Sequence, residues 1–391
     1  MPAGLAEVGG ESGVGMQAFD VVIVGGGLLG AAVAYELARR GQRVAIVERG
    51  PIGGEASWAS AGIISYPNRL NMPRERVEIT RRSRERYPAL VEQLESETGV
   101  AIEYQRPGNL LVAVDEAGAA EVNRLAEWQQ SLGFRVESLD PEAARRLEPA
   151  LTGQLTAAWF APDVGALRVQ RLTEALAMAA SRRGAAIMSD VPVEEVTHEG
   201  TRVTGVRTTQ GLVPGGTVVL AAGAWTGGLS QSLGIDLPTR PVKGQLIAFA
   251  GAPTPPSHII SGRGGYILPR LDGTVTAAAT EEEAGFDRRV TGEAVAWLID
   301  LAGTLCPSLP RGELVSSWTG LRPATADGEP IMGPVPGYEG LWVAAGHFRT
   351  GAKEAPASAE LVATSLLSGR VDPLLQPFLP SRFNPGGTQA S

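Results

Sequence analysis

The segment from Phe19 to Arg49 constrains the fold of this chain more than any other part of the sequence. It begins with an apolar, β-branched run, Val21 to Val24, which stops at three consecutive glycines, Gly25 to Gly27. A segment with a helical pattern follows, and a second apolar run from Val44 to Val47 ends on Glu48. A strand, a glycine turn, a helix and a second strand in this order predict a parallel βαβ unit, and therefore an α/β sheet.

The glycines of this unit have the spacing Gly25-x-Gly27-x-x-Gly30, which is typical of a loop that binds a dinucleotide. Gly25 makes the tight turn, Gly27 lets the backbone approach a pyrophosphate, and Gly30 lets the helix pack closely on the strand. The helix N-terminus offers free N–H groups and the positive end of its dipole to the phosphates. Glu48 can accept hydrogen bonds from a ribose. The segment predicts a dinucleotide site and leaves open which dinucleotide binds.

The composition indicates a large chain with enough apolar residues for two domains. Of its 391 residues, 43% are hydrophobic and 19% are charged. The net charge of −8 argues against a nucleic-acid partner, and the charges from Arg74 to Arg86 are mixed in sign at helical spacing, as on a solvated helix face. Cys306 is the single cysteine, which excludes an internal disulfide. The histidines, His198, His258 and His347, are scattered, so no metal site is expected.

The first eighteen residues do not have the pattern expected of a secretion signal. Residues 1–18 are rich in glycine and lack the basic and apolar regions of a secretion signal, so they predict a disordered tail, with Met16 as an alternative start. No apolar run is long enough to span a membrane. We therefore expect a cytoplasmic protein.

The order of the predicted elements interrupts the dinucleotide domain twice. After Gly99 the pattern changes to short strands, at 101–104 and 109–114, and to helices at 117–132 and 140–147. Further along the chain, a buried apolar strand is expected from Thr217 to Trp225. We expect a Rossmann-like α/β domain and a second, mainly antiparallel α+β domain for the substrate. The predicted segments are a tail (1–18), the dinucleotide domain (19–97, 168–240 and 319–370), the substrate domain (98–167 and 241–318) and a C-terminal tail (371–391).

Several further motifs follow the glycine loop in a characteristic order. They are Glu55 to Ile63, Leu220 to Trp225, Tyr266 to Arg270 with Ala279-Thr280, Gly320-Leu321-Arg322-Pro323, and Ala345 to Gly351. Together these motifs resemble the FAD-dependent D-amino acid oxidase superfamily and, within it, the glycine oxidases of thiamine biosynthesis. The resemblance spans roughly residues 19–370.

The resemblance implies that the dinucleotide is FAD, bound in an extended conformation. It also implies a non-covalent flavin, because the sarcosine-oxidase relatives attach theirs through a cysteine close after the position of Arg322, where this chain has Pro323-Ala324-Thr325. The helix after Gly351 would point its N-terminus at the N1–C2=O edge, where reduced flavin is negative. The expected FAD-binding residues are Gly25, Gly27, Leu28, Leu29 and Gly30 near the pyrophosphate, Glu48 and Arg49 at the ribose, Ala56, Ser57, Ala61, Gly62 and Ile63 on the flavin side, Val193 at the adenine, Gly223 and Trp225, and the loop His347, Phe348, Arg349, Thr350, Gly351, Ala352 and Lys353.

The resemblance further implies an amino acid oxidase, with three residues that carry the chemistry. Arg322 would bind the substrate carboxylate, because a guanidinium forms two parallel hydrogen bonds with a carboxylate. Tyr266 would donate to the same carboxylate, and Arg349 would add positive charge near the substrate or the flavin. With a neutral amine, hydride passes from Cα to flavin N5 without a general base, so His347 is assigned to the flavin loop. The products would be an imine, then a 2-oxo acid and ammonia, with hydrogen peroxide formed from dioxygen.

The sequence leaves three functional alternatives open. The first is an oxidase of glycine, sarcosine or small D-amino acids, and the second is a dehydrogenase that passes electrons to a quinone or a partner subunit. The third is a catalytically idle flavin-binding subunit of a hetero-oligomer. Its support is that Lys353 and Glu354 stand where glycine oxidases carry apolar residues, either to act on the flavin or to reach solvent or a partner. A homo-oligomer is also open.

A run of three glutamates also admits two interpretations. Glu281, Glu282 and Glu283 follow the Tyr266 motif, where residues that line the substrate pocket are expected. They form either an acidic rim that favours small or cationic amines or a solvated turn.

Overall fold

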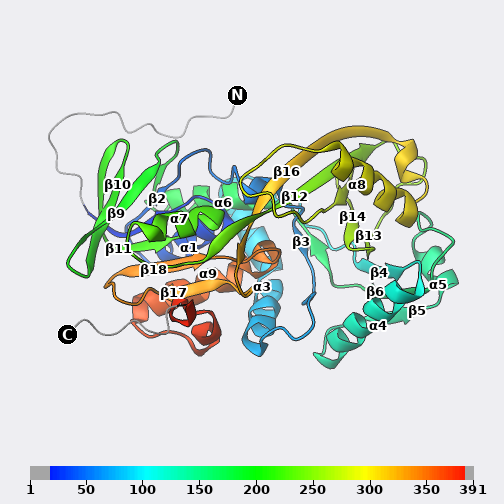
Figure 1. The fold of residues 1–391 in the computed structure, drawn as a ribbon, viewed down its shortest axis with the longest axis horizontal. Coiled ribbons are helices and arrows are strands. Elements are labelled where there is room, and N and C mark those ends of the chain that lie inside the picture. The colour runs from blue at the N-terminus through cyan, green and yellow to red at the C-terminus, as the bar shows by residue number, and fades with distance from the viewer. Residues whose placement is uncertain (1–17, 384–391) are drawn as a thin grey trace.

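Two eight-stranded sheets organise the protein, whose computed structural model describes residues 18–383. Figure 1 shows them next to each other along the long axis of the molecule. The first sheet has the strand order β17-β18-β11-β1-β2-β8, with β10 and β9 paired off β11. Its strands are β1 (Phe19–Val24), β2 (Val44–Val47), β8 (Ala186–Met188), β9 (Val193–Glu199), β10 (Arg202–Thr208), β11 (Gly211–Leu220), β17 (Ile331–Pro334) and β18 (Leu341–Ala345).

The strands at the centre of the first sheet are parallel and buried on both faces. β1 pairs with β2 and β11 in parallel, and β11 pairs with β18 in parallel. Alternate residues of β1 belong to different clusters, because side chains alternate across a sheet. Val21 and Ile23 pack with the helices, whereas Val22 and Val24 pack with β9 and β10 on the other face. This two-sided burial explains why β1 is apolar throughout.

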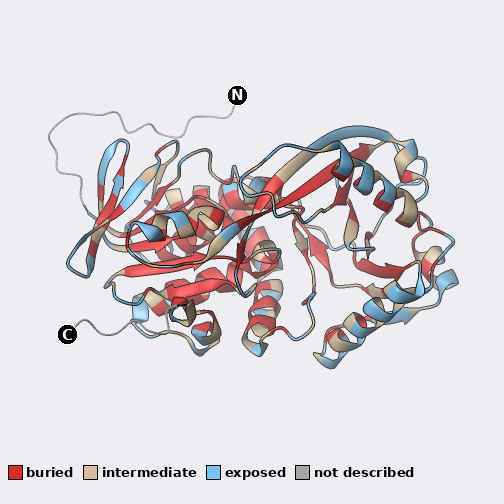
Figure 2. Cartoon of the chain, in the orientation of Figure 1, coloured by how far each residue is buried: buried red, intermediate tan, exposed pale blue. Residues whose placement is uncertain are grey.

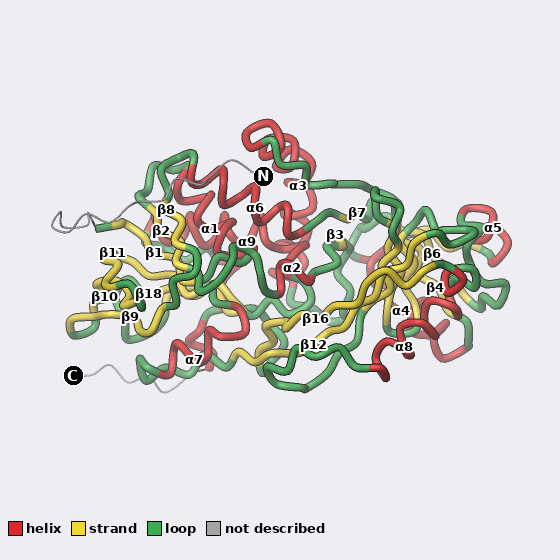
Figure 3. The backbone as a smooth tube through the Cα atoms, turned by 90° about the horizontal axis from the view of Figure 1, so that it is seen from above, coloured by secondary structure: helices red, strands yellow, loops and turns green. Residues whose placement is uncertain are grey.

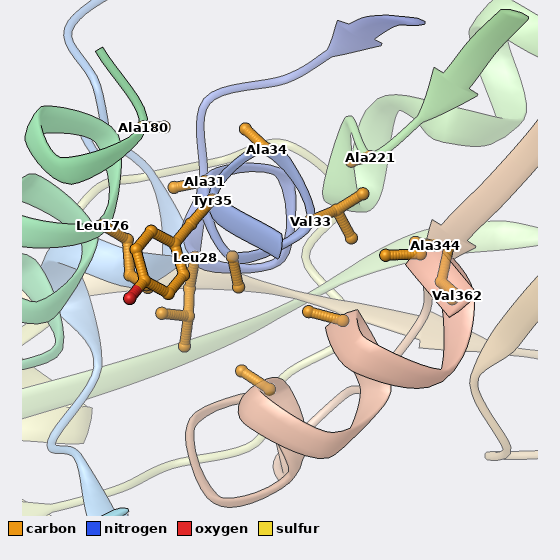
Figure 4. Packing of buried hydrophobic residues seen from close by; sticks show 14 of the residues in the cluster. Leu28, Ala31, Val33, Ala34, Tyr35, Leu176, Ala180, Ala221, Ala344 and Val362 are labelled. Atoms are coloured by element: carbon orange, nitrogen blue, oxygen red, sulfur yellow. The ribbon is translucent and has the colours of Figure 1, made fainter. Parts of the chain in front are cut away.

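Helices cover one face of the first sheet, as Figure 3 shows for α1, α6 and α9. In Figure 4, Tyr35 of α1 lies beside Leu176 of α6, and Val33 of α1 points toward Ala344 of β18. The described helices are α1 (Leu28–Ala38), α2 (Ala56–Ala59), α3 (Arg74–Thr98), α4 (Glu116–Ser131), α5 (Pro141–Leu147), α6 (Val169–Ser181), α7 (Thr226–Gln231), α8 (Gly292–Leu305) and α9 (Gly351–Ser368).

The second sheet is mainly antiparallel, with the strand order β16-β12-β15-β14-β13-β4-β6-β5. Helix α8 covers one of its faces through Leu298, Leu301 and Leu305. The strands are β4 (Asn109–Ala113), β5 (Glu137–Leu139), β6 (Ala157–Ala161), β12 (Thr239–Ala250), β13 (Ile259–Gly262), β14 (Gly265–Pro269), β15 (Val275–Ala278) and β16 (Glu313–Thr325), and a separate pair joins β3 (Ile63–Ile64) to β7 (Gly165–Ala166). The predicted combination of an α/β sheet and a mainly antiparallel second sheet is confirmed.

Three local predictions differ from the structure. Residues 101–104 form no strand, and a single bridge joins Gln105 to Ala166 instead. The strand predicted to reach Trp225 ends at Leu220, and Gly223–Trp225 is a 3₁₀ turn. The interpretation of 371–391 as a tail is wrong for residues 371–383, because two 3₁₀ helices there bury Leu375 and Phe378 completely.

Other predictions concern what is absent or lies outside residues 18–383. The burial pattern in Figure 2 covers the described residues, and residues 1–17 of the tail predicted at 1–18 and the last residues, 384–391, lie outside them. Within 18–383, no helix has the length and apolarity needed to cross a membrane. The same range contains no cluster of potential metal ligands.

A buried carboxylate ties two loops at the far end of the second sheet. Oε2 of Glu148 accepts hydrogen bonds from the backbone N–H of Ser257 at 2.8 Å and of His258 at 2.9 Å, and from the Ser257 hydroxyl. Burial alone would raise the pKa of Glu148, but its hydrogen bonds with His258, Ser257 and Ala150 outweigh burial and lower the pKa to about 2. The ionised form therefore stabilises the fold.

We expect Glu148→Gln to lower the free energy of unfolding by about 2–3 kcal/mol at pH 7, because charge-assisted hydrogen bonds are lost. The folded-state pKa is below the ordinary value, so this stability is present above pH 4.5 and is lost as the pH falls toward 2. Urea denaturation at pH 7 and pH 3.5 measures it. The exposed Glu142→Gln on α5 is the control, and an equal deficit at both pH values would contradict the prediction.

Candidate functional site

One elongated cavity of about 1200 Å³ lies between the carboxyl ends of the parallel strands and a face of the second sheet. Val24, Val47 and Ala221 mark the strand ends, and Gly244 and Tyr266 belong to the second sheet. The carboxyl ends of parallel strands are the usual ligand site in α/β sheets. Of the predicted site residues, the wall includes Gly25, Gly27, Leu28, Leu29, Glu48, Arg49, Ala56, Ser57, Ala61, Gly62, Ile63, Val193, Gly223, Trp225, Tyr266, Arg322, His347, Phe348, Arg349, Gly351 and Ala352.

The glycine loop forms one end of the cavity. Gly25 has φ of 110°, and a Cβ added there would lie 2.5 Å from the carbonyl oxygen of Ala221. A Cβ added to Gly30 would lie 1.9 Å from the carbonyl oxygen of Gly25. Gly30 is therefore a packing residue and does not line the cavity. Helix α1 starts at Gly27 without a side-chain cap there, although the Leu28 N–H donates to Ser57 Oγ at 2.9 Å.

Glu48 belongs to the loop as well as to the cavity wall. Its Oε2 accepts from the Gly26 N–H at 2.7 Å, and its Oε1 accepts from the Gly50 N–H at 3.1 Å. Burial raises the pKa of Glu48, and these backbone hydrogen bonds act against that rise. The same carboxylate that suits a ribose therefore also holds the glycine turn in shape.

A stack of side chains lies beside Glu48. The sequence motifs indicated Arg49 and Trp225 but did not predict that they form a stack with Phe286. The Arg49 guanidinium lies 3.6 Å from the centre of the Trp225 ring, and Phe286 lies on Trp225 with ring centres 5.1 Å apart. Glu55 pairs with both Arg49 and Arg288. Phe286 and Arg288 come from the loop between β15 and α8, so that loop reaches from the second sheet to the dinucleotide end. No motif marks it.

Arg322 and Tyr266 lie on the second sheet, in the part of the cavity away from the glycine loop. Nη1 of Arg322 donates to the Thr280 carbonyl at 2.9 Å and to the Lys243 carbonyl at 3.4 Å. Burial lowers the pKa of Arg322 and raises that of Tyr266, so the tyrosine remains a phenol that can donate. The guanidinium packs on Gly244, where an added Cβ would lie 2.2 Å from Nη2. The sequence carried no signal for this role of Gly244.

Arg349 lines the cavity and pairs with Glu281, and both side chains are about half exposed. Glu282 is 3.4 Å from Lys243 Nζ, and Glu283 pairs with Arg240. All three glutamates thus have cationic partners. They form neither an uncompensated acidic rim nor a turn that contacts solvent alone.

Thr350 and Lys353, two predicted FAD contacts, are absent from the cavity wall. Thr350 Oγ1 is 2.7 Å from Arg76 Nη2 and 2.7 Å from Glu354 Oε2. Lys353 Nζ donates to the Tyr66 carbonyl at 3.1 Å and to Asn68 Oδ1 at 2.9 Å. Its burial lowers the pKa to about 7. Lys353 therefore holds a loop that itself lines the cavity.

Glu354 is also buried, although the sequence left solvent or a partner open for it. Its carboxylate contacts Arg76 Nε at 3.2 Å and accepts from Thr80 Oγ1 at 3.2 Å, so it joins α9 to α3. Arg76 also pairs with Glu329 at 2.7 Å. Together, Arg76, Glu329 and Glu354 form a buried ionic cluster behind the first turn of α9.

We expect Arg76→Met to destabilise the protein by about 3–5 kcal/mol, because it leaves the buried Glu354 carboxylate without its cation. Removing both charges, in Arg76→Met with Glu354→Met, should restore a large part of that loss. Thermal unfolding of the holoenzyme measures both effects, and the exposed Arg74→Met on the same helix is the control. A double variant no more stable than Arg76→Met alone would contradict this interpretation.

His347 and the start of α9 form the remaining wall. His347 Nε2 is 3.1 Å from Ser358 Oγ, whereas Nδ1 has no hydrogen-bond partner among residues 18–383. Burial lowers the pKa of His347 to about 4, so the imidazole is neutral at pH 7. Gly351 and Ala352 belong to the first turn of α9 and line the cavity.

The cavity fits an extended FAD molecule. It has a glycine cradle that side chains would fill and a carboxylate suited to a ribose at one end, and a helix N-terminus at the other. A helix N-terminus suits the electron-rich edge of a reduced flavin.

Comparisons with known proteins agree with this geometry. The family model described as DAO, FAD dependent oxidoreductase, matches residues 20–365. A glycine oxidase of Pseudomonas aeruginosa is 37% identical over 91% of this chain and 96% of its own length. The crystal structure of glycine oxidase from Bacillus cereus superposes with a TM-score of 0.87 at 33% identity, covering 92% of this chain and 98% of that one. The hydrogen cyanide synthase subunit HcnC of Pseudomonas aeruginosa is 30% identical over 94% of this chain and 97% of its own length. The chain therefore belongs to the DAO family of FAD-dependent oxidoreductases.

Proposed function

We propose that this protein oxidises glycine or another small amino acid, such as sarcosine or a small D-amino acid, to the corresponding imine. FAD-dependent amino acid oxidation follows from the family and the glycine oxidase relatives. The observation that carries the finer proposal is the partly buried Arg322 guanidinium on the cavity wall. It hydrogen-bonds to two backbone carbonyls and to no carboxylate among the described residues, so its charge is left for a ligand.

The roles of the residues follow from their positions. Arg322 binds the substrate carboxylate, and the Tyr266 phenol donates a hydrogen bond to it. Arg349 is a weaker candidate for direct substrate contact, because Glu281 already pairs with it. Holding the carboxylate fixes the direction of the Cα–H bond, and orientation is the main requirement for direct hydride transfer.

FAD, held by the glycine loop, Glu48 and the start of α9, would supply a two-electron acceptor for the Cα hydride, and its reoxidation by dioxygen would yield hydrogen peroxide. Hydride loss from a neutral amine leaves an iminium ion that keeps both nitrogen protons, and water hydrolyses this ion to a 2-oxo acid and ammonium. No side chain is needed as a base if the amine enters neutral. His347 is buried and hydrogen-bonded to Ser358, in agreement with its assignment to the flavin loop.

We further propose that the flavin is held without a covalent bond. Residues 323–325 contain no cysteine. Cys306 is buried in the cluster between α8 and the second sheet, where burial raises its pKa to about 12. It does not line the cavity.

A second candidate function differs from the first in its electron acceptor. Similarity to the HcnC subunit supports a dehydrogenase that passes electrons to a quinone or a partner subunit. The idle-subunit alternative loses its sequence support, because Lys353 and Glu354 have partners inside the chain.

We expect glycine to bleach the flavin anaerobically and air to restore its absorbance with one hydrogen peroxide per glycine. A coupled peroxidase assay and stopped-flow absorbance measure the two half-reactions. If the reduced flavin is reoxidised slowly by air and rapidly by a quinone dye, the protein is a dehydrogenase and the oxidase proposal is wrong. No bleaching by glycine, sarcosine or small D-amino acids would contradict the proposed function.

We expect Gly244→Ala to raise KM for glycine about 10- to 100-fold, because the new methyl group displaces the Arg322 guanidinium and its charged hydrogen bonds. The displaced atoms are the end of a flexible side chain, so the fold and the flavin absorbance should persist. Gly292→Ala is the matched control, since a Cβ there meets no atom within 4 Å. An unchanged KM for glycine in Gly244→Ala would contradict the proposal that Arg322 binds the substrate carboxylate.

A further inference from the structure

The cavity continues past Tyr266 into a part that a glycine molecule at Arg322 does not reach. Asn109, Glu121, Leu125, Gln129, Ser261 and Trp297 line this part, which we call the distal chamber. In the strand order of the second sheet, Arg322 lies on β16, Tyr266 on β14, Ser261 on β13 and Asn109 on β4. Tyr266 therefore lies between Arg322 and the distal chamber.

The register of the strands sets the distance from Tyr266 to the distal chamber. Ser261 pairs directly with Tyr266, and it pairs with Leu111 on the other side. Neighbouring strands are about 4.8 Å apart, so β4 lies about 10 Å from β14. A substrate that reaches from Arg322 to the distal chamber must carry a substituent several bonds long.

The distal chamber contains a buried acceptor oxygen, that of Gln129. Gln129 is held by the hydrogen bond from its Nε2 to the Pro67 carbonyl at 2.7 Å, which leaves Oε1 buried with no partner among residues 18–383. Asn109 Oδ1 accepts from the Ser261 hydroxyl at 3.0 Å. A buried acceptor without a partner is costly, and a ligand donor at this place would remove that cost.

The charge of the distal chamber is negative. Glu121 is an exposed residue of α4 that lines the cavity and forms no ion pair with any residue in 18–383. Of the described residues on the cavity wall, the cationic ones are Arg49, Arg322 and Arg349, and all three are outside the distal chamber. A carboxylate there would meet Glu121 with no compensating cation, whereas an ammonium group would be attracted to it.

We propose that the distal chamber is a subsite for a protonated amine, so that the enzyme takes amino acids that carry a second, cationic nitrogen. This inference rests on the proposed function. Arg322 holds the carboxylate, and the substituent passes Tyr266 into the distal chamber. Its ammonium group donates to the amide oxygen of Gln129 and is attracted by the charge of Glu121, which lies about two turns away on α4. The substituent is carried either on the reacting nitrogen or on Cα.

Pairs of substrates of equal shape test this subsite in the holoenzyme. N-(3-aminopropyl)glycine and N-butylglycine differ in the terminal ammonium, and so do D-ornithine and D-norleucine. We expect kcat/KM to be higher for the cationic member of one pair by about threefold or more, as for a partly exposed charge pair. The pair that shows the preference identifies which atom carries the substituent. N-(2-carboxyethyl)glycine should be the poorest of the N-substituted substrates.

Variants of Glu121 connect the preference to the distal chamber. Glu121→Gln should reduce the cationic preference about threefold and leave glycine kinetics unchanged, and Glu121→Lys should shift the preference toward N-(2-carboxyethyl)glycine. Glu127→Gln is the matched control, because Glu127 is exposed on the same helix and does not line the cavity. Dissociation constants from the change in flavin absorbance, measured with substrate analogues that lack the reacting hydrogen, give a readout independent of turnover.

The outcomes separate this proposal from the one on which it rests. If no cationic preference exists, or if Glu127→Gln changes it as much as Glu121→Gln, the distal subsite is wrong while glycine oxidation stands. If glycine, sarcosine and D-amino acids all fail to bleach the flavin, the proposed function is wrong. Glu121-dependent binding of the cationic analogues would then still support the subsite.

Discussion

The contact between the start of α1 and the turn after β1 is the constraint on which the rest of the structure depends. Gly30 and Gly25 approach so closely that a single methyl group would overlap the backbone. This approach sets α1 against the sheet, and α6 and α9 then pack on α1. Because α9 starts at the cavity, one tight turn aligns both helix N-termini that face the dinucleotide.

The second sheet supplies the groups that are suited to a substrate. Arg322 can lie flat over β12 because Gly244 has no side chain, and its guanidinium is held by two carbonyls. A partly buried guanidinium that has only carbonyl partners would be stabilised further by a carboxylate ligand. We therefore propose that the site binds an anion at Arg322 and rejects one in the distal chamber.

Charged residues near the cavity are largely compensated inside the protein. Glu354 has Arg76, Glu281 has Arg349, and Glu282 lies near Lys243. Lys353 is held by carbonyl and amide oxygens rather than by a carboxylate. These partners stand far away in the chain, from α3, the Tyr66 loop and β12. For this reason the sequence left Lys353 and Glu354 open between a role at the flavin and a role at the surface.

The sequence by itself determined the parallel βαβ unit, the interrupted layout and the glycine loop, because these depend on local patterns and on short spacings between residues. It also placed Tyr266 and Arg322 in motifs, through resemblance to a family. Only the tertiary structure decided the packing of Arg322 on Gly244, the Arg49–Trp225–Phe286 stack, the burial of Leu375 and Phe378, and the distal chamber. The physical reason is that each of these joins segments far apart in the chain through side-chain contacts, and no local pattern records which distant side chain will be the partner.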